Sequence, residues 1–179
     1  MEVVALPLAG LRLVKPRVFS DARGFLLEIY QGRRYREAGL PAQFVQDNHS
    51  RSARGVLRGL HYQLPNPQGK LVACLSGEIF DVAVDLRRSS PTFGRWHGVQ
   101  LSGENHWQLY VPDGFAHGFC VLSDTAHVLY KCTDYYSPGN EHTLIWNDPT
   151  VGVDWPVREP VLSEKDAQGK RLSECLLFA

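Results

Sequence analysis

The chain has 179 residues, of which 44% are hydrophobic and 21% charged, and its 19 basic side chains balance its 19 acidic ones. This length is sufficient for one domain with a sizeable core, and we predict a single domain over residues 1–179. Because a general nucleic-acid binder normally carries a basic excess, the balanced charge argues against that class, although local basic residues could still bind a small anion.

The first predicted element is a short helix over residues 31–39, which ends at Gly39. Residues 70–87 (KLVACLSGEIFDVAVDLR) then predict two strands joined by a turn at residues 76–78. In the second strand apolar and acidic residues alternate, which predicts one apolar and one partly polar face. The apolar residues are Phe80, Val82, Val84 and Leu86, and the acidic ones are Asp81 and Asp85.

Residues 106–136 predict a strand, a proline–glycine turn and then a hairpin around Asp124 and Thr125. The C-terminal residues 163–177 predict a second helix with Ser163 as its cap, which Gly169 weakens. Four residues of the last predicted strand share one face: Ala126, Val128, Tyr130 and Cys132.

Many short strands with helices only near the edges predict an all-β fold, either a β-sandwich or a jelly-roll barrel. The 16 glycines and 11 prolines are spread along the chain and divide it into the short segments that such a fold requires. Barrels of this kind hold small ligands between their sheets.

The four cysteines and the N-terminus favour a cytoplasmic protein. Cys74, Cys120, Cys132 and Cys175 form no C-x-x-C pair, so reduced thiols are the simplest interpretation. The N-terminal MEVVALPLAG lacks the basic start of a secretory signal. No stretch approaches the ~18 apolar residues of a membrane span, so we expect no membrane partner.

Three different nitrogen groups lie close together in the proline-broken stretch RGLHYQLPNPQGKL, at Arg58, His61 and Lys70. Among apolar neighbours they indicate a polar site cut into a core. Lys70 precedes the apolar run of residues 71–75, so it either extends its amine to water or serves a buried anion. Taken alone, His61 is more simply a core histidine with its hydrogen bonds satisfied.

Other candidate residues also have structural explanations. His117 lies between glycines in PDGFAHGF, where a ligand contact and a turn histidine are equally consistent with the sequence. Ser163 and Asp166 match the S-x-x-[DE] capping box, which would make Asp166 purely structural. Tyr130 would by default be a core tyrosine with its hydroxyl at the mouth of the barrel.

Known motifs exclude several kinds of site. Metal-binding cupin barrels use an H-x-H pair, whereas the corresponding stretch here reads Leu60-His61-Tyr62, so a metal site is disfavoured. The phosphate loop G-x-x-x-x-G-K-[ST], the dinucleotide fingerprint G-x-G-x-x-G and the nucleophile elbow G-x-S-x-G are all absent.

A series of longer motifs between Arg17 and Asp166 closely resembles the dTDP-4-dehydrorhamnose 3,5-epimerase family. The motifs are DARGFLLEIY, FVQDNHSRS, GVLRGLHYQ, QGKLVACLSGEIFDVAVDLRRSSPTFGRW, VPDGFAHGF, LYKCTDYYSP, WNDP and LSEKD. The resemblance implies an all-β, cupin-like jelly-roll barrel with short peripheral helices that acts as a homodimer without a cofactor or metal.

The resemblance also implies an isomerase whose substrate is a dTDP-4-keto-6-deoxyhexose. The family reaction is 3,5-epimerisation of dTDP-4-dehydro-6-deoxy-D-glucose to dTDP-4-dehydro-L-rhamnose, on the way to dTDP-L-rhamnose. By analogy His61 is the base, Asp166 its orienting partner, Tyr130 the acid on the other face of the sugar, and Lys70 a neighbour of the C4 oxygen. The implied substrate contacts are Arg23, Glu28, Gln46, Asp47, Asn48, Arg58, Lys70, His117, Glu141 and Lys165.

The chemistry calls for these residue types. Removing a proton next to a ketone requires a positioned base and stabilisation of the negative charge on the ketone oxygen, and inversion requires a proton donor on the opposite face. Two facing strands of a barrel are suited to hold His61 and Tyr130 on opposite sides of a flat sugar. Guanidinium groups such as those of Arg23 and Arg58 suit a diphosphate.

Three other functions remain open from the sequence. Relatives in the same superfamily epimerise only C3 or only C5, or isomerise the keto sugar. A non-catalytic sugar-nucleotide-binding barrel would be expected to lack the base or its partner, and a metal-dependent cupin enzyme would be expected to carry H-x-H. Exchange of the N-terminal strand within a dimer, which would bring Arg23 or Glu28 into the partner's site, is also left open.

Overall fold

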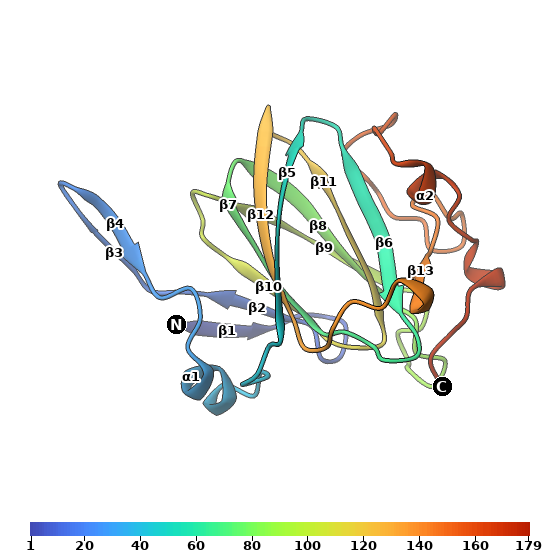
Figure 1. Ribbon diagram of the computed structural model, residues 1–179, viewed down its shortest axis with the longest axis horizontal. Helices are drawn as coiled ribbons and strands as arrows, with labels where there is room; N and C mark the ends of the chain where they lie inside the picture. The colour runs from blue at the N-terminus through green and yellow to red at the C-terminus, as the bar shows by residue number, and fades with distance from the viewer.

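The computed structural model describes residues 1–179 and consists mainly of strands, arranged in two facing sheets (Figure 1). The six-stranded sheet has the order β1 (Glu2–Ala5), β2 (Arg12–Lys15), β10 (Gln108–Val111), β7 (Lys70–Ser76), β12 (Thr125–Cys132) and β5 (Gln46–Ala53). The five-stranded sheet has the order β13 (Glu141–Thr143), β6 (Leu57–Gln63), β11 (Phe115–Val121), β8 (Glu78–Asp85) and β9 (Trp96–Ser102). The predicted all-β, jelly-roll type of fold is confirmed.

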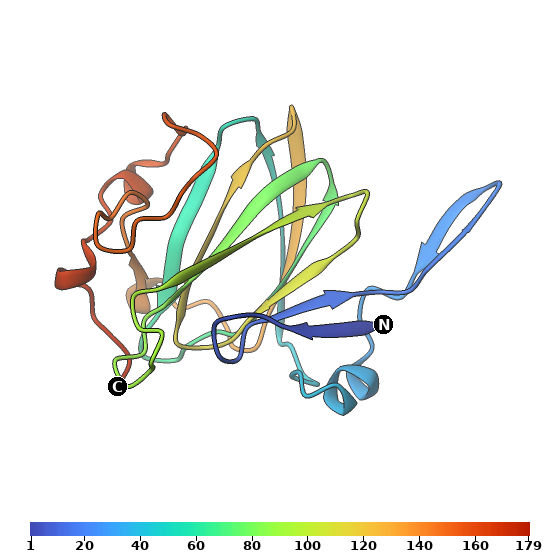
Figure 2. The same ribbon diagram turned by 180° about the vertical axis from the view of Figure 1, so that it is seen from behind.

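The main core lies between the two sheets. Val72 and Leu109 of the six-stranded sheet and Ile79 and Phe119 of the five-stranded sheet belong to one cluster of buried apolar residues. The outer face of the five-stranded sheet is covered by the C-terminal segment, which contributes Trp155 and other residues to a second cluster. Figure 2 shows this segment, in orange and red, on the side of the barrel away from the N-terminus.

Consecutive strands cross between the sheets where the sequence suggested simple turns. The predicted strands over residues 70–87 are present as β7 and β8, but they belong to opposite sheets. Gly77, between them, has a φ of +79°, and a Cβ atom there would overlap the carbonyl oxygen of Thr125. The corner therefore requires glycine.

The hairpin predicted around Asp124 and Thr125 is wrong for the same reason. Strands are present on both sides, but β11 pairs with β6 and β8, whereas β12 pairs with β5 and β7. A corner between two sheets and a tight hairpin both need short polar turns, so the local sequence does not separate them.

Strand β8 turns its partly polar face inward. Its apolar residues Val82 and Val84 pack under the C-terminal segment, whereas Asp81 and Asp85 point into the barrel and are fully buried. The acidic residues of this strand are thus available to the interior.

The two predicted helices differ in outcome. Helix α1 (Gly32–Glu37) is present, and the chain leaves it at Gly39, whose φ is +77°. The predicted C-terminal helix is only a single turn, α2 (Glu164–Ala167), and the 3₁₀ turn η2 (Leu172–Glu174) follows it. Another 3₁₀ turn, η1 (Pro138–Asn140), lies earlier in the chain. Helix α2 stops because Lys170 hydrogen-bonds through its backbone to Thr143 and Ile145, and Gly169 lies against the backbone of Ile145. None of the helices is long and apolar enough to cross a membrane.

One hairpin projects from the barrel, as both ribbon views show (Figures 1 and 2). It consists of β3 (Val18–Asp21) and β4 (Gly24–Leu27). Phe19, Phe25 and Leu26 on it are 53%, 59% and 74% exposed. We refer to these three residues as the hairpin patch, and apolar side chains so exposed and so close together are typical of a surface that another chain covers.

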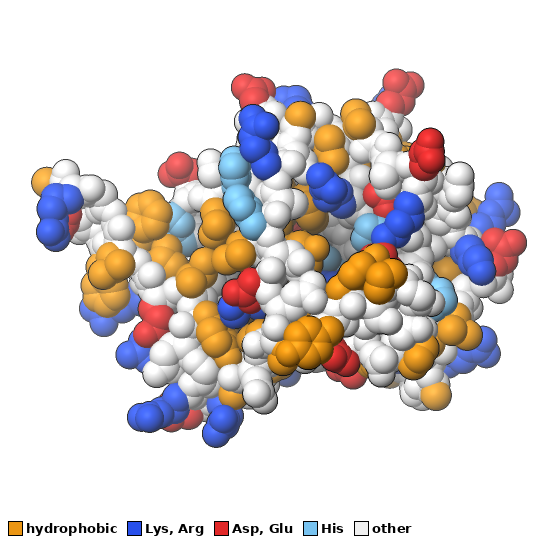
Figure 3. Space-filling view, viewed as in Figure 1, with side chains coloured by type: hydrophobic (Ala, Val, Ile, Leu, Met, Phe, Trp, Pro, Cys, Tyr) orange, Lys and Arg blue, Asp and Glu red, His pale blue; other side chains and the backbone are white.

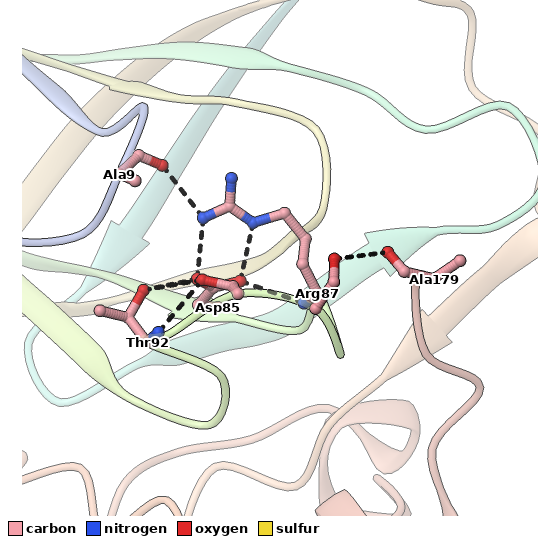
Figure 4. Close-up of polar contacts among 7 residues, drawn as sticks. Ala9, Asp85, Arg87, Thr92 and Ala179 are labelled. Atoms are coloured by element: carbon pink, nitrogen blue, oxygen red, sulfur yellow. Dashed lines mark hydrogen bonds and ion pairs between the residues drawn. The ribbon is translucent and has the colours of Figure 1, made fainter.

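A buried carboxylate organises the loop at one end of the barrel (Figure 4). Asp85 accepts hydrogen bonds from Arg87 Nε and Nη2, both at 2.8 Å, from Ser90 Oγ at 2.6 Å and from Thr92 Oγ1 at 2.7 Å. Arg87 also donates to the carbonyl oxygen of Ala9, which ties the loop to the N-terminal segment. Burial alone would raise the pKa of Asp85, but these hydrogen bonds outweigh it and lower the pKa to about 2.

We expect Asp85→Asn to lower the free energy of unfolding by roughly 2 kcal/mol at pH 7. This is the stabilisation that corresponds to the shift of the wild-type Asp85 pKa from 3.8 in the unfolded chain to about 2 in the folded one. Because the folded-state pKa is depressed, this stabilisation is present above the unfolded value and is lost as the pH falls through the folded one. Urea unfolding of both proteins between pH 7 and pH 2 should therefore show a difference that shrinks in the acidic range. The exposed Asp154, changed to Asn, is the control, and equal stability of Asp85→Asn and wild type at pH 7 would contradict the interpretation.

Candidate active site

A cavity of about 340 Å³ opens between the two sheets. Most of the residues that line it are polar, and Figure 3 shows lysine, arginine and histidine side chains gathered around the hollow. The lining residues are Gln46, Asn48, Ser50, Arg58, His61, Gln68, Lys70, His117, Gly118, Phe119, Tyr130, Cys132, Tyr136, Glu141 and Lys165. Residues far apart in the sequence therefore meet in one polar site.

His61, on β6, is bonded to Asp166 behind it. Its Nε2 lies 2.5 Å from Asp166 Oδ1, and Asp166 is 3% exposed. Burial alone would raise the pKa of the Asp166 carboxyl, but the hydrogen bond and charge of His61, with smaller contributions from its other neighbours, outweigh burial and lower the pKa overall. The carboxyl group is therefore ionised and must accept the hydrogen of the His61 N–H. Asp166 thus keeps the hydrogen on Nε2, and in the neutral ring Nδ1 carries the free lone pair.

The helix cap predicted for Ser163 and Asp166 involves only the backbone of Asp166. The Ser163 hydroxyl accepts from the Asp166 backbone N–H at 3.1 Å and so caps α2, whereas the Asp166 carboxylate is directed at His61. One residue therefore serves both the helix start and the histidine.

A second carboxylate lies on the other side of the His61 ring. Glu141, on β13, places Oε1 3.9 Å from His61 Nδ1. Its Oε2 accepts from the hydroxyl of Tyr136 at 2.9 Å and from the ammonium of Lys165. Burial opposes ionisation of Glu141, but Lys165, His61 and Tyr136 together lower its pKa.

Lys70, on β7, carries the least compensated charge in the cavity. It is 9% exposed, and no carboxylate of the chain forms an ion pair with it. Burial lowers its pKa because the charged form is poorly solvated there. An amine in this state gains most from a ligand that brings negative charge into the cavity.

Tyr130 faces the cavity from the sheet opposite His61. It lies on β12 of the six-stranded sheet, whereas His61 lies on β6 of the five-stranded sheet, and both line the same space. Burial, together with nearby groups that include Glu141, raises the pKa of Tyr130. Its phenol therefore stays protonated at neutral pH and is a hydrogen donor.

His117 belongs to a second histidine–aspartate pair, on the floor of the cavity. Its Nε2 lies 2.8 Å from Asp81 Oδ1, and both side chains are buried. Sequence reasoning named His117 as a candidate but missed Asp81 as its partner. The available signal was the acidic alternation along β8, once that face is known to point inward.

Strand alternation separates the candidates on β5. Gln46, Asn48 and Ser50 alternate along the strand and all point into the cavity. Ser50 was not predicted from the sequence, although it lies on the same face of the strand as the other two. Asp47 points outward and forms an ion pair with Lys131 at 2.8 Å. Its side chain does not line the cavity.

Two further candidates lie outside the cavity of their own chain. Arg23, at the tip of the β3–β4 hairpin, is paired with Asp21, and Glu28 is paired with Arg34 at 2.9 Å. No residue of the hairpin lines the cavity. Apart from Arg23, Glu28 and Asp47, every candidate either lines the cavity or, like Asp166, bonds to a residue that does.

Comparison with known proteins matches the chain to one enzyme family along nearly its whole length. A family model described as dTDP-4-dehydrorhamnose 3,5-epimerase matches residues 5–174. A dTDP-4-dehydrorhamnose 3,5-epimerase of Pseudomonas aeruginosa is 56% identical over 180 residues, 99% of each chain. One of Neisseria gonorrhoeae is 55% identical over 171 residues, and the match covers 95% of this chain but only 52% of that relative, about half its length.

A solved structure agrees with these relatives. The crystal structure of the dTDP-6-deoxy-D-glucose-3,5-epimerase of Legionella pneumophila in complex with dTDP-4-keto-L-rhamnose superposes with a TM-score of 0.94 at 52% identity. The match covers 97% of this chain and 93% of that one. On these findings, together with the cavity between its sheets, the chain belongs to the dTDP-4-dehydrorhamnose 3,5-epimerase family.

Proposed function

We propose that the chain is an isomerase that converts dTDP-4-dehydro-6-deoxy-D-glucose to dTDP-4-dehydro-L-rhamnose by inverting C3 and C5, in the biosynthesis of dTDP-L-rhamnose. The observation that carries this proposal is the pair of His61 and Tyr130 on opposite walls of one polar cavity. The names of the relatives support the same reaction.

His61 is the base in this proposal. A proton next to the C4 ketone is too weakly acidic for an unaided imidazole, so the ring must be both oriented and stabilised once protonated. Asp166, ionised and bonded to Nε2, does both, and it leaves Nδ1 to take the proton from carbon.

Lys70 stabilises the negative charge that develops on the C4 oxygen. It has no carboxylate partner of its own, so its ammonium is free to pair with an enolate. A donor of this kind in a water-poor site is typically worth roughly 3–4 kcal/mol of transition-state stabilisation.

Tyr130 delivers the new proton from the opposite face. The raised pKa of its phenol keeps the proton in place until the enolate forms. Because C3 and C5 flank the same carbonyl, one base, one enolate partner and one donor serve both carbons. The remaining cavity residues bind the nucleotide and the sugar: Gln46, Asn48, Arg58, His117, Glu141 and Lys165.

We further propose that the protein acts as a homodimer in which the β3–β4 hairpin of one copy reaches the cavity of the other. The hairpin patch is exposed, and β5, which carries Gln46 and Asn48, is one of the two edge strands of its sheet. A hairpin from a second copy along this edge would bring Arg23 and Glu28 to the nucleotide, where Arg23 suits a phosphate.

Complementation tests this arrangement. Arg23→Ala and His61→Ala should each be nearly inactive, but dissociated and reassembled together they should recover about a quarter of wild-type activity, because each heterodimer then has one complete site. His61→Ala mixed with Tyr130→Phe is the control and should recover nothing, since those residues belong to one chain's site. Equal recovery in both mixtures, or in neither, would contradict the exchanged hairpin.

The reaction itself is tested by incubating the protein with dTDP-4-dehydro-6-deoxy-D-glucose in heavy water and following deuterium by NMR. Incorporation at both C3 and C5 with inversion is expected. Incorporation at one carbon only would identify a C3- or C5-only epimerase. No incorporation at either would favour a non-catalytic sugar-nucleotide-binding barrel.

A further inference from the structure

The two carboxylates at His61 differ in their access to solvent. The Asp166 side chain is 5% exposed and holds Nε2, the nitrogen that does not react. The Glu141 side chain is 16% exposed and faces Nδ1 at 3.9 Å. Its neighbours on the outer side, Lys165 and Tyr136, are both about half exposed. The His61 side chain is itself 24% exposed, and Glu141 connects its Nδ1 to the more exposed Lys165 and Tyr136.

A double epimerisation requires the base to be reset between the two carbons. In the first inversion the C–H bond breaks, its electrons form the enolate, and the proton bonds to His61 Nδ1. Tyr130 then loses its own proton to the other face of the carbon. The site is left with an imidazolium and a phenolate, and neither can act at the second carbon.

We infer that Glu141 carries the proton from His61 to solvent and so returns the base to its neutral form while the sugar stays bound. This inference rests on the proposed function. The Nδ1–H bond breaks, the proton passes to Glu141 Oε1, directly after a small movement or through one bridging water, and then to water outside. The Tyr130 phenolate takes a proton from water in turn, so the site regains its starting charges.

The contacts of Glu141 suit this role. Lys165 and Tyr136 both bond to Oε2, which leaves Oε1 directed at His61 without another partner. The lowered pKa of Glu141 keeps it ionised and ready to accept. The other charged groups around it, Lys70 and Lys165, are cations and cannot accept a proton while charged. Asp166 cannot replace it, because Asp166 faces the wrong nitrogen and is closed from solvent.

Glu141→Gln tests the inference, because glutamine keeps the size and a carbonyl oxygen but cannot take the proton. We expect kcat to fall by about 10²-fold or more, the lower end of the contribution of a positioned proton-transfer group. The primary isotope effect of substrate deuterated at C3 and C5 should shrink, since resetting the base becomes the slow step. At fixed pH and ionic strength, formate or imidazole buffer should raise the rate of this variant and leave wild type unchanged.

Two further variants complete the experiment. Glu164→Gln removes an exposed carboxylate one residue from Lys165 and should keep wild-type rate and buffer independence. Glu141→Asp keeps a proton acceptor and should retain more activity than Glu141→Gln with less response to buffer. Wild-type kcat in Glu141→Gln, or a loss that buffer does not restore, would overturn the inference.

The wild-type deuterium experiment separates this inference from the proposed function. If wild type incorporates deuterium at both carbons and Glu141→Gln behaves like wild type, only the role of Glu141 fails. If wild type incorporates at neither carbon, both proposals fail together.

Discussion

Replacing His61 by alanine is expected to abolish deuterium entry at C3 and at C5 together, with a loss of about 10³-fold or more, because one base serves both carbons. Asp166, which is ionised, holds Nε2 of this ring, while Nδ1 forms no hydrogen bond and has Glu141 Oε1 3.9 Å away. The other cavity histidine, His117, uses its Nε2 on buried Asp81. NMR in heavy water measures exchange at the two carbons in the same sample.

Asp166→Asn and Ser163→Ala are the matched controls for the orienting partner. Asp166→Asn keeps the size of the side chain but loses the charge that stabilises the imidazolium, and we expect a loss of roughly 10²- to 10⁴-fold. Ser163→Ala removes only the helix cap on the Asp166 backbone and should cost about 1 kcal/mol of stability with little change in rate. If His61→Ala still exchanges at either carbon, another residue is the base for that carbon. If Ser163→Ala loses as much activity as Asp166→Asn, the position of α2 matters more than the carboxylate.

Strand positions could be predicted from the sequence because alternation is a local property. The strands over residues 70–87 and the strand carrying Tyr130 appear where they were expected. Their pairing could not be predicted, because a corner between sheets and a hairpin turn contain the same residue types. The inward direction of Asp81 depends on which face of β8 the C-terminal segment covers, and that segment lies some seventy residues further along the chain.

For the site as well, residues in local motifs could be predicted, whereas contacts between distant segments could not. His61, Lys70 and Tyr130 came from motifs, and the structure brings them to one cavity, although their catalytic roles remain proposals. For Asp166 the sequence left two explanations, a helix cap from its spacing to Ser163 and an orienting partner of His61 from the LSEKD motif. The contact with His61, 105 residues away in sequence, shows that the carboxylate is directed at the histidine. Arg23 lies at the tip of the hairpin and Glu28 directly after it, and neither lines the cavity of its own chain, so their role as substrate contacts depends on the proposed dimer.

Tyr130→Phe is expected to separate proton removal from inversion. Phenylalanine fills the same space without a donor, so His61 still takes the proton, exchanges it with solvent and returns deuterium to the same face. Inverted product should fall by about 10²- to 10⁴-fold, the usual contribution of a positioned acid, while deuterium still enters the unreacted sugar with retention.

The exposed Tyr135, changed to Phe, is the control and should invert at the wild-type rate. Exchange with retention would place the second proton donor on the wall opposite His61, as the position of Tyr130 on β12 requires. A variant that loses exchange as well as inversion would mean that the phenol is needed to form the enolate. A variant that still inverts at the wild-type rate would mean that the proton comes from another group of the cavity, and that Tyr130 serves only as its wall.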